Sequence, residues 1–277
     1  MNFKIHRGTQ EIGGSCIEVW TESTRIVLDF GMPLVEKDGV GFDFRKYENL
    51  SDSELIQKGI LPDIDGLYEN SEKCIDGLVI SHPHLDHYGL INFLSPKVKI
   101  HLGEAAHKII ELTNIFTPSQ NDINNCEYFE KEKPFTIGDI TITPFWMDHS
   151  AYDAYALLLE SNGKTLFYSG DFRGHGRKSK VFKWFTHNAP QNVDYLLMEG
   201  TPEGIDLNDV VQSMETIDGV NNVHHVHIWQ IDENRNALEA HVVLSEVGRM
   251  ESVKAAIKTH LHDEYHIEHS TLEFEDE

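Results

Sequence analysis

The sequence predicts an α/β fold in two parts, a layered domain followed by a much smaller unit. The first observation is that residues 1–201 alternate short apolar runs with helical patterns, which is typical of helices layered on sheets. The second is that residues 206–277 follow a shorter order of helix, hairpin, helix and strand. The chain contains no internal repeat and no low-complexity linker, so the two parts are expected to abut near residues 200–206.

The strands of the first part are predicted by short apolar runs that lie between turn residues. Helices are expected at 86–94 and 103–114 from the spacing of their apolar residues. Residues 32–72 are expected to form a long surface loop with a short helix near 51–58. The predicted strands are, in order, FKIH, CIEVW, RIVLDF, GLVIS, VKIHL, ITITPFW, YALLLE, KTLFYSGD and YLLME.

The second part begins with an amphipathic helix, because residues 206–216 place their apolar side chains on one face. An Asp-Gly turn leads into the strand VNNVHHVHIWQI, and the turn DENRN leads into ALEAHVVLS, so residues 222–244 form a predicted hairpin. Residues 250–261 form a second helix, and YHIEHSTLEF is the last strand. This α-β-β-α-β order predicts a small two-layer sandwich with a three-stranded sheet.

The chain is strongly acidic, with 23 basic and 46 acidic residues and a net charge of −23. Such a chain repels a phosphate backbone, which counts against nucleic acid as a partner. About half of the charge lies in residues 205–277, which hold 4 basic residues, 16 acidic residues and 8 of the 17 histidines. An acidic, histidine-rich unit suits the binding of divalent cations, although solubility alone explains the same composition.

Cysteine usage and hydropathy indicate a cytoplasmic protein. Cys16, Cys74 and Cys126 are widely spaced and odd in number, which predicts reduced thiols rather than a disulfide framework. The N-terminus lacks the apolar region of a signal peptide. No membrane span is expected, because nothing approaches the roughly 18 consecutive apolar residues that cross a bilayer.

The strongest functional motif is SHPHLDHYG at residues 81–89, between an apolar strand and a predicted helix. It places His82, His84, Asp86 and His87 within six residues. Imidazoles and a carboxylate are the ligands that suit zinc and similar divalent ions, whereas a turn needs no histidine. The motif therefore predicts a metal site.

Two further polar residues stand at strand ends in the same way. His149 follows the strand ITITPFW, and Asp171 follows the strand KTLFY. Each alone is more often an ordinary polar or turn residue. One sheet edge would nevertheless bring both of them beside the histidine motif, so we expect all three segments to meet at one site.

These motifs resemble the metallo-β-lactamase superfamily, and within it the branch of ribonuclease J and related β-CASP nucleases. The resemblance covers residues 1 to about 201, through EIGGSCIEV, RIVLDFGMPL, SHPHLDHYG, MDHSAYDAYALLLE and SGDFR. The family fold is an αββα sandwich with two metal ions at one edge of its sheets. The resemblance implies a metal-dependent hydrolase of phosphodiesters, thioesters, lactams or lactones, and the scaffold does not choose among them.

The resemblance also implies a role for each candidate ligand. The implied ligands are His82, His84 and His149 for the first ion, Asp86 and His87 for the second, and Asp171 as the bridge between them. We expect zinc at one or both positions, and we assign catalysis to Asp86.

The chain departs from the family pattern after Asp171. The family supplies one more histidine to the second ion, and in the nuclease branch it follows the β-CASP insertion, which is missing here. His175 and His187 lie nearby but match no family position. Occupancy of the second ion site and the presence of the last strands of the sandwich therefore stay open. The basic residues that follow suit either a substrate phosphate or a solvated loop; they are Arg173, Arg177, Lys178, Lys180 and Lys183.

Residues 202–277 resemble another family, the cytoplasmic C-terminal domain of cation diffusion facilitators, which export zinc and manganese. GIDLNDVVQSMETIDGV, GVNNVHHVHIWQ, ALEAHVVL and YHIEHSTLEFE carry the resemblance, and Trp229 stands at the family's aromatic position. That domain has a fold similar to a metallochaperone, dimerises and binds divalent metal, so a metallochaperone-like sandwich and a homodimer through residues 202–277 are implied. The exporter's membrane helices are missing, so we expect no transport by this chain alone. The implied ligands are His224, His241 and His269, with His225, His260, His262 and His266 as alternates.

The sequence LLMEGT resembles both families, so the two resemblances meet there. We expect a metallo-β-lactamase-like domain at 1–201 and a cation-diffusion-facilitator-like domain at 202–277. One function that follows is a metal-dependent hydrolase with an appended metal-binding dimerisation domain. The alternative is a non-catalytic cytoplasmic metal sensor or buffer whose hydrolase half has lost turnover. The histidine motif favours the first, and the missing last histidine favours the second.

Overall fold

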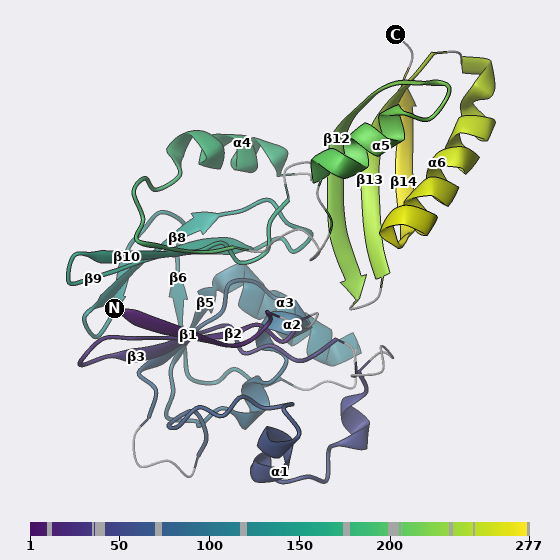
Figure 1. The fold of residues 1–277 in the computed structure, drawn as a ribbon. Coiled ribbons are helices and arrows are strands. Elements are labelled where there is room, and N and C mark those ends of the chain that lie inside the picture. Colours follow the sequence, from purple (N-terminus) through teal and green to yellow (C-terminus); the bar gives the residue numbers. More distant parts are fainter. Residues whose placement is uncertain are drawn as a thin grey trace. The chain divides into compact units, whose positions relative to one another are not determined.

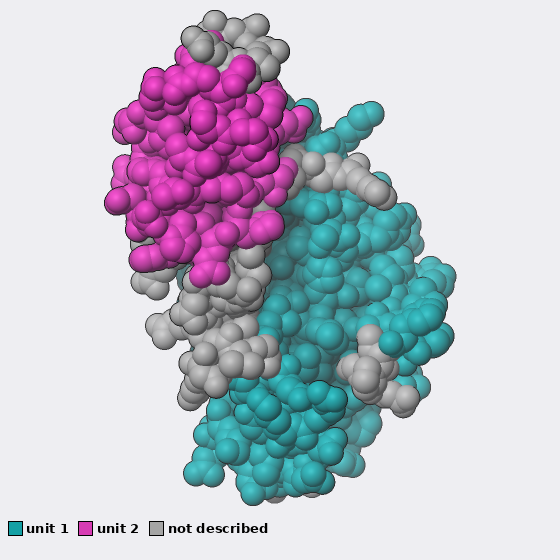
Figure 2. All heavy atoms as spheres, turned by 90° about the vertical axis from the view of Figure 1, so that its right-hand side faces the viewer, with its two compact units in different colours: residues 1–36, 41–199 teal, residues 37–40, 200–277 magenta. Residues whose placement is uncertain are grey.

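The computed structural model divides into two compact units, which Figure 2 shows in different colours. Unit 1 comprises residues 1–36 and 41–199, and unit 2 comprises residues 37–40 and 200–277. The residues that the structure describes are 1–9, 13–34, 36, 42–69, 74–116, 121–173, 178–198, 205, 207–232, 235–245 and 247–275. The predicted domain boundary at 201/202 lies outside these ranges and remains a prediction.

Unit 1 is a sandwich of two β-sheets (Figure 1). The larger sheet has the order β1-β2-β3-β4-β5-β6, in which the first three strands are antiparallel and β3 to β6 are parallel. The smaller sheet has the order β11-β10-β9-β8-β7. The strands are β1 (Asn2–Arg7), β2 (Cys16–Trp20), β3 (Arg25–Leu28), β4 (Gly77–Val79), β5 (Ile100–Gly103), β6 (Cys126–Phe129), β7 (Phe135–Ile137), β8 (Ile140–Trp146), β9 (Tyr155–Ser161), β10 (Lys164–Tyr168) and β11 (Tyr195–Leu197).

The two sheets pack face to face through the apolar side chains on their inner faces. Val19 and Leu28 of the larger sheet share a buried cluster with Ile142 and Leu157 of the smaller one. Successive side chains of a strand point to opposite faces, so β2 to β5 also contribute to a core on the outer side of the larger sheet. Removal of this apolar area from water is the main stabilisation of the sandwich.

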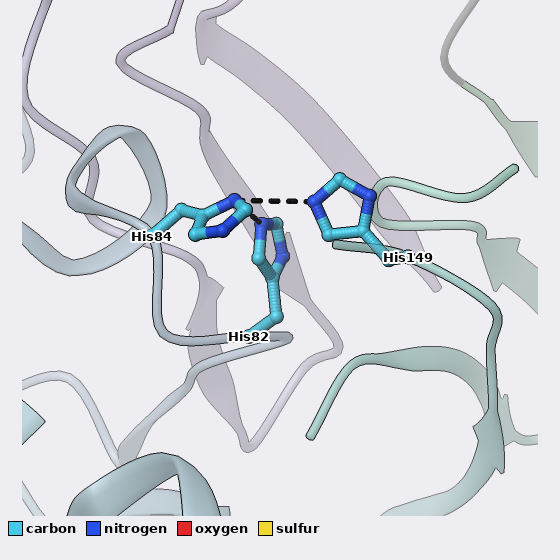
Figure 3. A group of neighbouring side chains, drawn as sticks. All are labelled: His82, His84 and His149. Carbon is cyan, nitrogen blue, oxygen red and sulfur yellow. Dashed lines mark hydrogen bonds between the residues drawn. The ribbon is translucent and has the colours of Figure 1, made fainter. Parts of the chain in front are cut away.

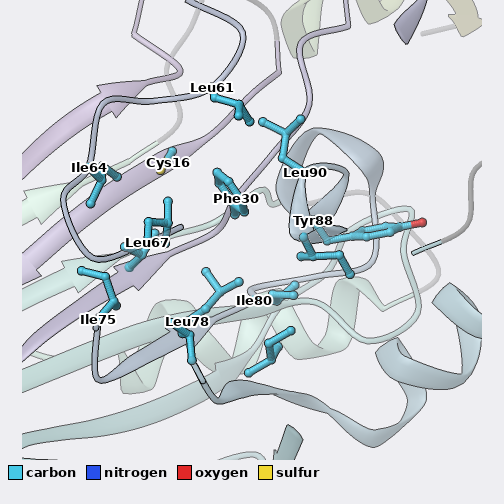
Figure 4. Close-up of a cluster of buried hydrophobic side chains, with 14 of the residues drawn as sticks. Cys16, Phe30, Leu61, Ile64, Leu67, Ile75, Leu78, Ile80, Tyr88 and Leu90 are labelled. Atoms are coloured by element: carbon cyan, nitrogen blue, oxygen red, sulfur yellow. The ribbon is translucent and has the colours of Figure 1, made fainter. Parts of the chain in front are cut away.

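Helices cover the outer faces of both sheets. α1 (Asp52–Gln57), α2 (Leu85–Tyr88) and α3 (Glu104–Phe116) pack on the larger sheet and enclose the cluster drawn in Figure 4. α4 (Ser179–Asn188) packs on the smaller sheet, where Phe185 stacks on Phe167 with a centroid distance of 5.6 Å. The layers therefore follow the order helix, sheet, sheet, helix, which is the αββα class that the sequence predicts.

Four elements of unit 1 differ from the sequence prediction. The prediction omits β6 and β7, because strands of four and three residues at sheet edges carry too few alternating apolar positions. It also omits α4, in which no residue is fully buried. The helix expected at 86–94 ends at Tyr88, and Ile91–Phe93 forms a separate 3₁₀ turn. The α-helix stops because the carbonyls of Asp86 and His87 accept from the N–H groups of Ser15 and Phe30 instead of from a further helical turn.

Unit 2 has the predicted α-β-β-α-β order. Its three-stranded sheet has the order β12-β13-β14, with β12 antiparallel and β14 parallel to β13. The two helices and the sheet share one buried cluster, which contains Val210, Ile257, Leu238 and Val242. The elements are α5 (Leu207–Glu215), β12 (Val220–Asp232), β13 (Arg235–Leu244), α6 (Met250–Tyr265) and β14 (Ile267–Glu275), with a 3₁₀ turn at Val247–Arg249. Over the described ranges of both units, we find no helix with the length and apolar character that a bilayer span requires.

Candidate metal centre

The segment with the histidine motif lies between a strand and a four-residue helix. β4 ends at Val79, and His84 is the N-cap of α2. The loop after β3 approaches this helix so closely that a Cβ atom on Gly31 would lie only 1.6 Å from the carbonyl oxygen of Asp86. Only glycine permits this approach. The loop after β3 and the backbone of α2 therefore pack directly against each other, which restricts where the histidines of the motif can point.

Three imidazoles converge at this edge of the sandwich, as Figure 3 shows. His82 Nε2 lies 3.1 Å from His84 Nδ1, and His149 Nε2 lies 3.1 Å from the same atom. His149 comes from the loop between β8 and β9, 65 residues beyond His84. The three ligand atoms together form a group that could hold a metal ion.

The donor set fits a tetrahedral zinc ion. Zinc lies about 2.0–2.1 Å from an imidazole nitrogen, so neighbouring ligands of a tetrahedral ion are roughly 3.3 Å apart. The separations of 3.1 Å in this chain are close to that value. Three neutral imidazole nitrogens at such distances also satisfy one another poorly as hydrogen-bond partners, because each ring has only one N–H group.

A second group of ligands lies beside the first. His87 Nε2 is 3.3 Å from Asp171 Oδ1 and 3.5 Å from Asp86 Oδ2. The other oxygen of Asp171 is 3.8 Å from His82 Nε2 and 3.9 Å from His149 Nε2. Asp171 therefore lies between the two groups, and all six predicted ligands of unit 1 meet in one place.

Asp29 contacts this second group and is a candidate site residue that the sequence analysis does not identify. Its side chain is fully buried and accepts a 2.8 Å hydrogen bond from His87 Nδ1. It also accepts from the backbone and hydroxyl of Ser81, each at 2.7 Å, and from the hydroxyl of Tyr168 at 2.6 Å. Carboxylates often fix metal-binding histidines in this way. The only signal in the sequence is an aspartate at the end of the apolar run RIVLDF.

Burial sets the protonation of the histidines. It lowers the pKa of His82 well below its usual range, lowers that of His84, and lowers that of His149 to about 4. Burial also acts to lower the pKa of His87, but the neighbouring carboxylates, Asp171 first, raise it well above its usual value. Neutral imidazoles offer the nitrogen lone pairs that a metal ion requires.

Unit 2 contains its own candidate cluster, on the face of the sheet away from its core. His241 Nδ1 lies 2.6 Å from Glu275 Oε1, and His224 Nε2 lies 3.2 Å from Glu275 Oε2. The strand register places His224, His241 and Glu273 in one row, and Glu273 Oε2 is 3.5 Å from His241 Nε2. His224, His241 and Glu275 together could hold a metal ion.

Some predicted ligands lie elsewhere. His269 is paired with Ala237, and Glu275, which the sequence analysis does not name, stands in the cluster instead. His260 and His262 lie on α6 and His266 caps that helix, while the side chain of His225 is outside the described part. In unit 1, His187 bonds to the carbonyl of Lys183 on α4, and His175 and Arg177 are outside the described residues.

Comparisons with known proteins show what the chain is similar to. The model of the family described as "Beta-lactamase superfamily domain" matches residues 67–261, a range that takes in both units and so does not locate the boundary between them. A solved protein of unknown function from Enterococcus faecalis V583 has a TM-score of 0.62 and 25% identity, and the match covers 77% of this chain and 56% of that one.

Two curated relatives match different shares of the chain. The "Cadmium, cobalt and zinc/H(+)-K(+) antiporter" of Bacillus subtilis is 33% identical over 93 residues, 33% of this chain and 30% of the antiporter. The "Ribonuclease J" of Helicobacter pylori is 26% identical over 170 residues, 60% of this chain and 22% of that protein. The matches therefore span less than a third of either relative. They confirm the two resemblances that the sequence indicates.

Proposed function

Because this chain belongs to the β-lactamase superfamily, we propose that it is a metal-dependent hydrolase whose unit 1 holds zinc through His82, His84 and His149. The observation that carries the proposal is the meeting of one nitrogen from each imidazole, at separations of 3.1 Å around His84 Nδ1. The low pKa of all three side chains supports it, since each is available to a metal without first losing a proton near neutral pH.

When bound, zinc supplies a Lewis acid and lowers the pKa of a coordinated water to about 7. The chain's own residues hold the ligands in place and surround them. Asp171 would stand between the two metal positions, and Asp29 would hold the His87 ring in one orientation. Asp86 stays our candidate catalytic residue, because its side chain is 17% exposed beside the ligands and burial raises its pKa.

We propose weaker binding of a second ion by Asp86, His87 and Asp171. His87 holds its proton between Asp29 and Asp171, and an ion at this position must displace that proton. Apart from His82, no histidine of the described residues joins the group formed by His87 and Asp171. The extra histidine that the family supplies is thus without a counterpart in the described part of the chain.

The proposed substrate is a small molecule with a hydrolysable ester, thioester or lactam bond. One relative is named a ribonuclease, but a net charge of −23 opposes the approach of a polyanion. Of the basic residues after Asp171, Lys180 and Lys183 are exposed on α4, while Lys178 donates to backbone carbonyls. This arrangement does not favour a phosphate-binding patch.

For unit 2 we infer a divalent-cation site at His224, His241 and Glu275, and a homodimer through residues 202–277. The name of the antiporter relative includes cadmium, cobalt and zinc, which are ions that imidazole and carboxylate ligands suit. A unit of this size has a small core, and dimerisation would add to it. We also propose a cytoplasmic location, since Cys16, Cys74 and Cys126 are all free thiols.

A metal sensor or buffer without turnover is the second candidate function. The observation that favours it is the presence of metal-ligand clusters in both units together with an incomplete second position in unit 1. In that case unit 1 would bind metal but would leave every substrate intact.

Metal content and hydrolysis of purified protein separate these functions. We expect His84→Ala to lose the metal of unit 1 and all hydrolysis of p-nitrophenyl esters, phosphodiesters and lactams. We expect His241→Ala to lose only the metal of unit 2. His187→Ala, on the exposed side of α4, is the matched control and should change neither. Unchanged metal content and activity in His84→Ala would exclude the proposed centre, and full metal content without any hydrolysis in the wild type would favour the sensor.

A further inference from the structure

The loop that carries His149 is anchored on several sides. Its ends are joined where Met147 donates to the carbonyl of Ala154 at 2.9 Å. Near its end, Asp153 accepts from the backbone of Ala106 at 2.8 Å and from the hydroxyl of Tyr155 at 2.7 Å. The loop is therefore fixed at its base, but these contacts do not reach the residues directly beside His149.

Lys178 supplies the contacts next to the histidine. Its ammonium group donates to the carbonyl of Ala151 at 2.9 Å and to the carbonyl of Tyr152 at 2.8 Å. Its backbone N–H donates to Asp148 Oδ1 at 3.2 Å, and the same ammonium lies 5.6 Å from the centre of the Trp146 ring. Lys178 thus contacts the chain both before and after His149.

The same loop is tied to the segment that carries Asp171. The backbone N–H of Arg173 donates to the carbonyl of Asp148 at 2.7 Å. The Asp148 carboxylate is fully buried and lies 3.7 Å from Arg173 Nε. The segments that carry His149 and Asp171 are thereby linked through Asp148 and Arg173, although His149 and Asp171 are 22 residues apart in the sequence.

We propose that Lys178 is a positioning residue of the metal centre, which holds the His149 loop so that His149 Nε2 stays beside His84 Nδ1. The proposal rests on the proposed metal site of unit 1. A metal ligand on a loop binds tightly only when neighbouring groups fix its orientation, since otherwise binding must also order the loop. Lys178 is half-buried. Burial lowers the pKa of its ammonium group, whereas the nearby carboxylates of Asp148 and Asp153 act to raise it.

The test is Co²⁺ binding to the full chain, measured by visible absorption and by competition with a chelator. All proteins carry His224→Ala and His241→Ala, so that only the centre of unit 1 is observed. Lys178→Met keeps the length of the stem and removes the donors, and we expect about 10–100-fold weaker Co²⁺ binding. We also expect a changed visible spectrum of bound Co²⁺, which a loss of general stability would not produce. Lys183→Met is the control, because Lys183 is exposed on α4, the helix that Lys178 precedes, and it should bind Co²⁺ as the parent does.

Each outcome decides a separate point. Equal Co²⁺ affinity and equal spectra for Lys178→Met and its parent would overturn the role of Lys178 and leave the metal site intact. No Co²⁺ binding by the parent would instead refute the proposed metal site. If Lys178→Met does not fold, as shown by near-ultraviolet circular dichroism, Lys178→Gln and Lys183→Gln replace the pair. Glutamine can still donate to a carbonyl, so we expect an intermediate loss for Lys178→Gln, and no loss would overturn the proposal.

Discussion

His87 Nδ1 lies 2.8 Å from Asp29 Oδ2, and both side chains are buried. The opposite nitrogen of the same ring faces Asp171 and Asp86. Asp29 therefore fixes the orientation of the imidazole through its Nδ1 atom. Asp86 and Asp171 lie at the Nε2 side, where a second ion would bind.

We predict that Asp29→Asn weakens both the fold and the second metal position. The substitution removes a buried charge beside a protonated imidazole and leaves Tyr168 and Ser81 with a poorer acceptor. Loss of one partner of a buried ion pair costs about 3–5 kcal/mol. Urea unfolding of the metal-free protein should show a loss of this order. The control is Asp122→Asn, at an exposed position, which should unfold as the wild type does. Equal stability of the two variants would contradict the role of Asp29.

We predict that acid destabilises the metal-free protein through His149. Its pKa is about 4 in the folded chain and about 6.5 in an unfolded one, so the unfolded state binds more protons below pH 6.5. The stabilising contribution of neutral His149 is present above pH 6.5 and is lost as the pH falls towards 4. Between pH 7.5 and pH 5 this loss amounts to about 2 kcal/mol. His149→Asn lacks the titrating group. Between pH 7.5 and pH 5, its free energy of unfolding should therefore fall by about 2 kcal/mol less than that of the wild type. Identical pH dependence in both proteins would show that His149 does not titrate as described.

We predict that the core behind the histidine motif is essential for stability. Leu78 lies on β4, is fully buried and belongs to the cluster in Figure 4. Leu78→Ala should lower the free energy of unfolding by about 2–5 kcal/mol, because it leaves a cavity in a close-packed region. Leu112→Ala removes the same atoms from a side chain that is 54% exposed, and it should cost little. Unfolding by a chemical denaturant, monitored by tryptophan fluorescence, measures the stability of both variants and the wild type.

We predict that zinc tightens a homodimer of the full chain through unit 2. Residues 205–277 hold 16 acidic and 4 basic residues, so two copies repel each other, and bound cations reduce that repulsion. Light scattering at tens of micromolar, with and without zinc, should show a lower dissociation constant when zinc is present. His224→Ala with His241→Ala should abolish the zinc effect. A wild-type chain that stays monomeric under both conditions would refute the dimer.

The sequence predicts the layered fold, and it predicts that the candidate ligands of unit 1 lie close together because they stand at strand ends. His82, His84 and His87 lie in one short motif, so their proximity is a local property. The proximity of His149 to this motif is predicted only by the rule that strand ends meet at a sheet edge. Asp29 is harder to identify, because its partners Tyr168 and Ser81 lie 139 and 52 residues away and nothing local distinguishes it from a turn residue.

In unit 2 the structure brings together a different set of residues from the one that the sequence indicates. His269 is a plausible ligand on the last strand, but the register of a parallel pair depends on where the preceding helix ends. α6 ends at a left-handed His266, with φ of 53°, and the strand that follows pairs His269 with Ala237 rather than with His241. Glu273 and Glu275 then reach the histidine row. A sequence pattern gives the face of a strand but not its register against a parallel neighbour.

The long separations within the metal centre of unit 1 determine when it can form during synthesis. The bond between Asp29 and Tyr168 closes a loop of 139 residues, and Asp171 follows three residues later. A nascent chain that has emerged only as far as His87 already carries the whole motif but lacks both His149 and Asp171. Metal capture at the proposed centre would therefore follow the docking of β10 against the other strands and would not nucleate the fold. An ion bound there by all six proposed ligands would thus report that the chain has been made at least as far as Asp171 and that the two sheets of unit 1 have come together.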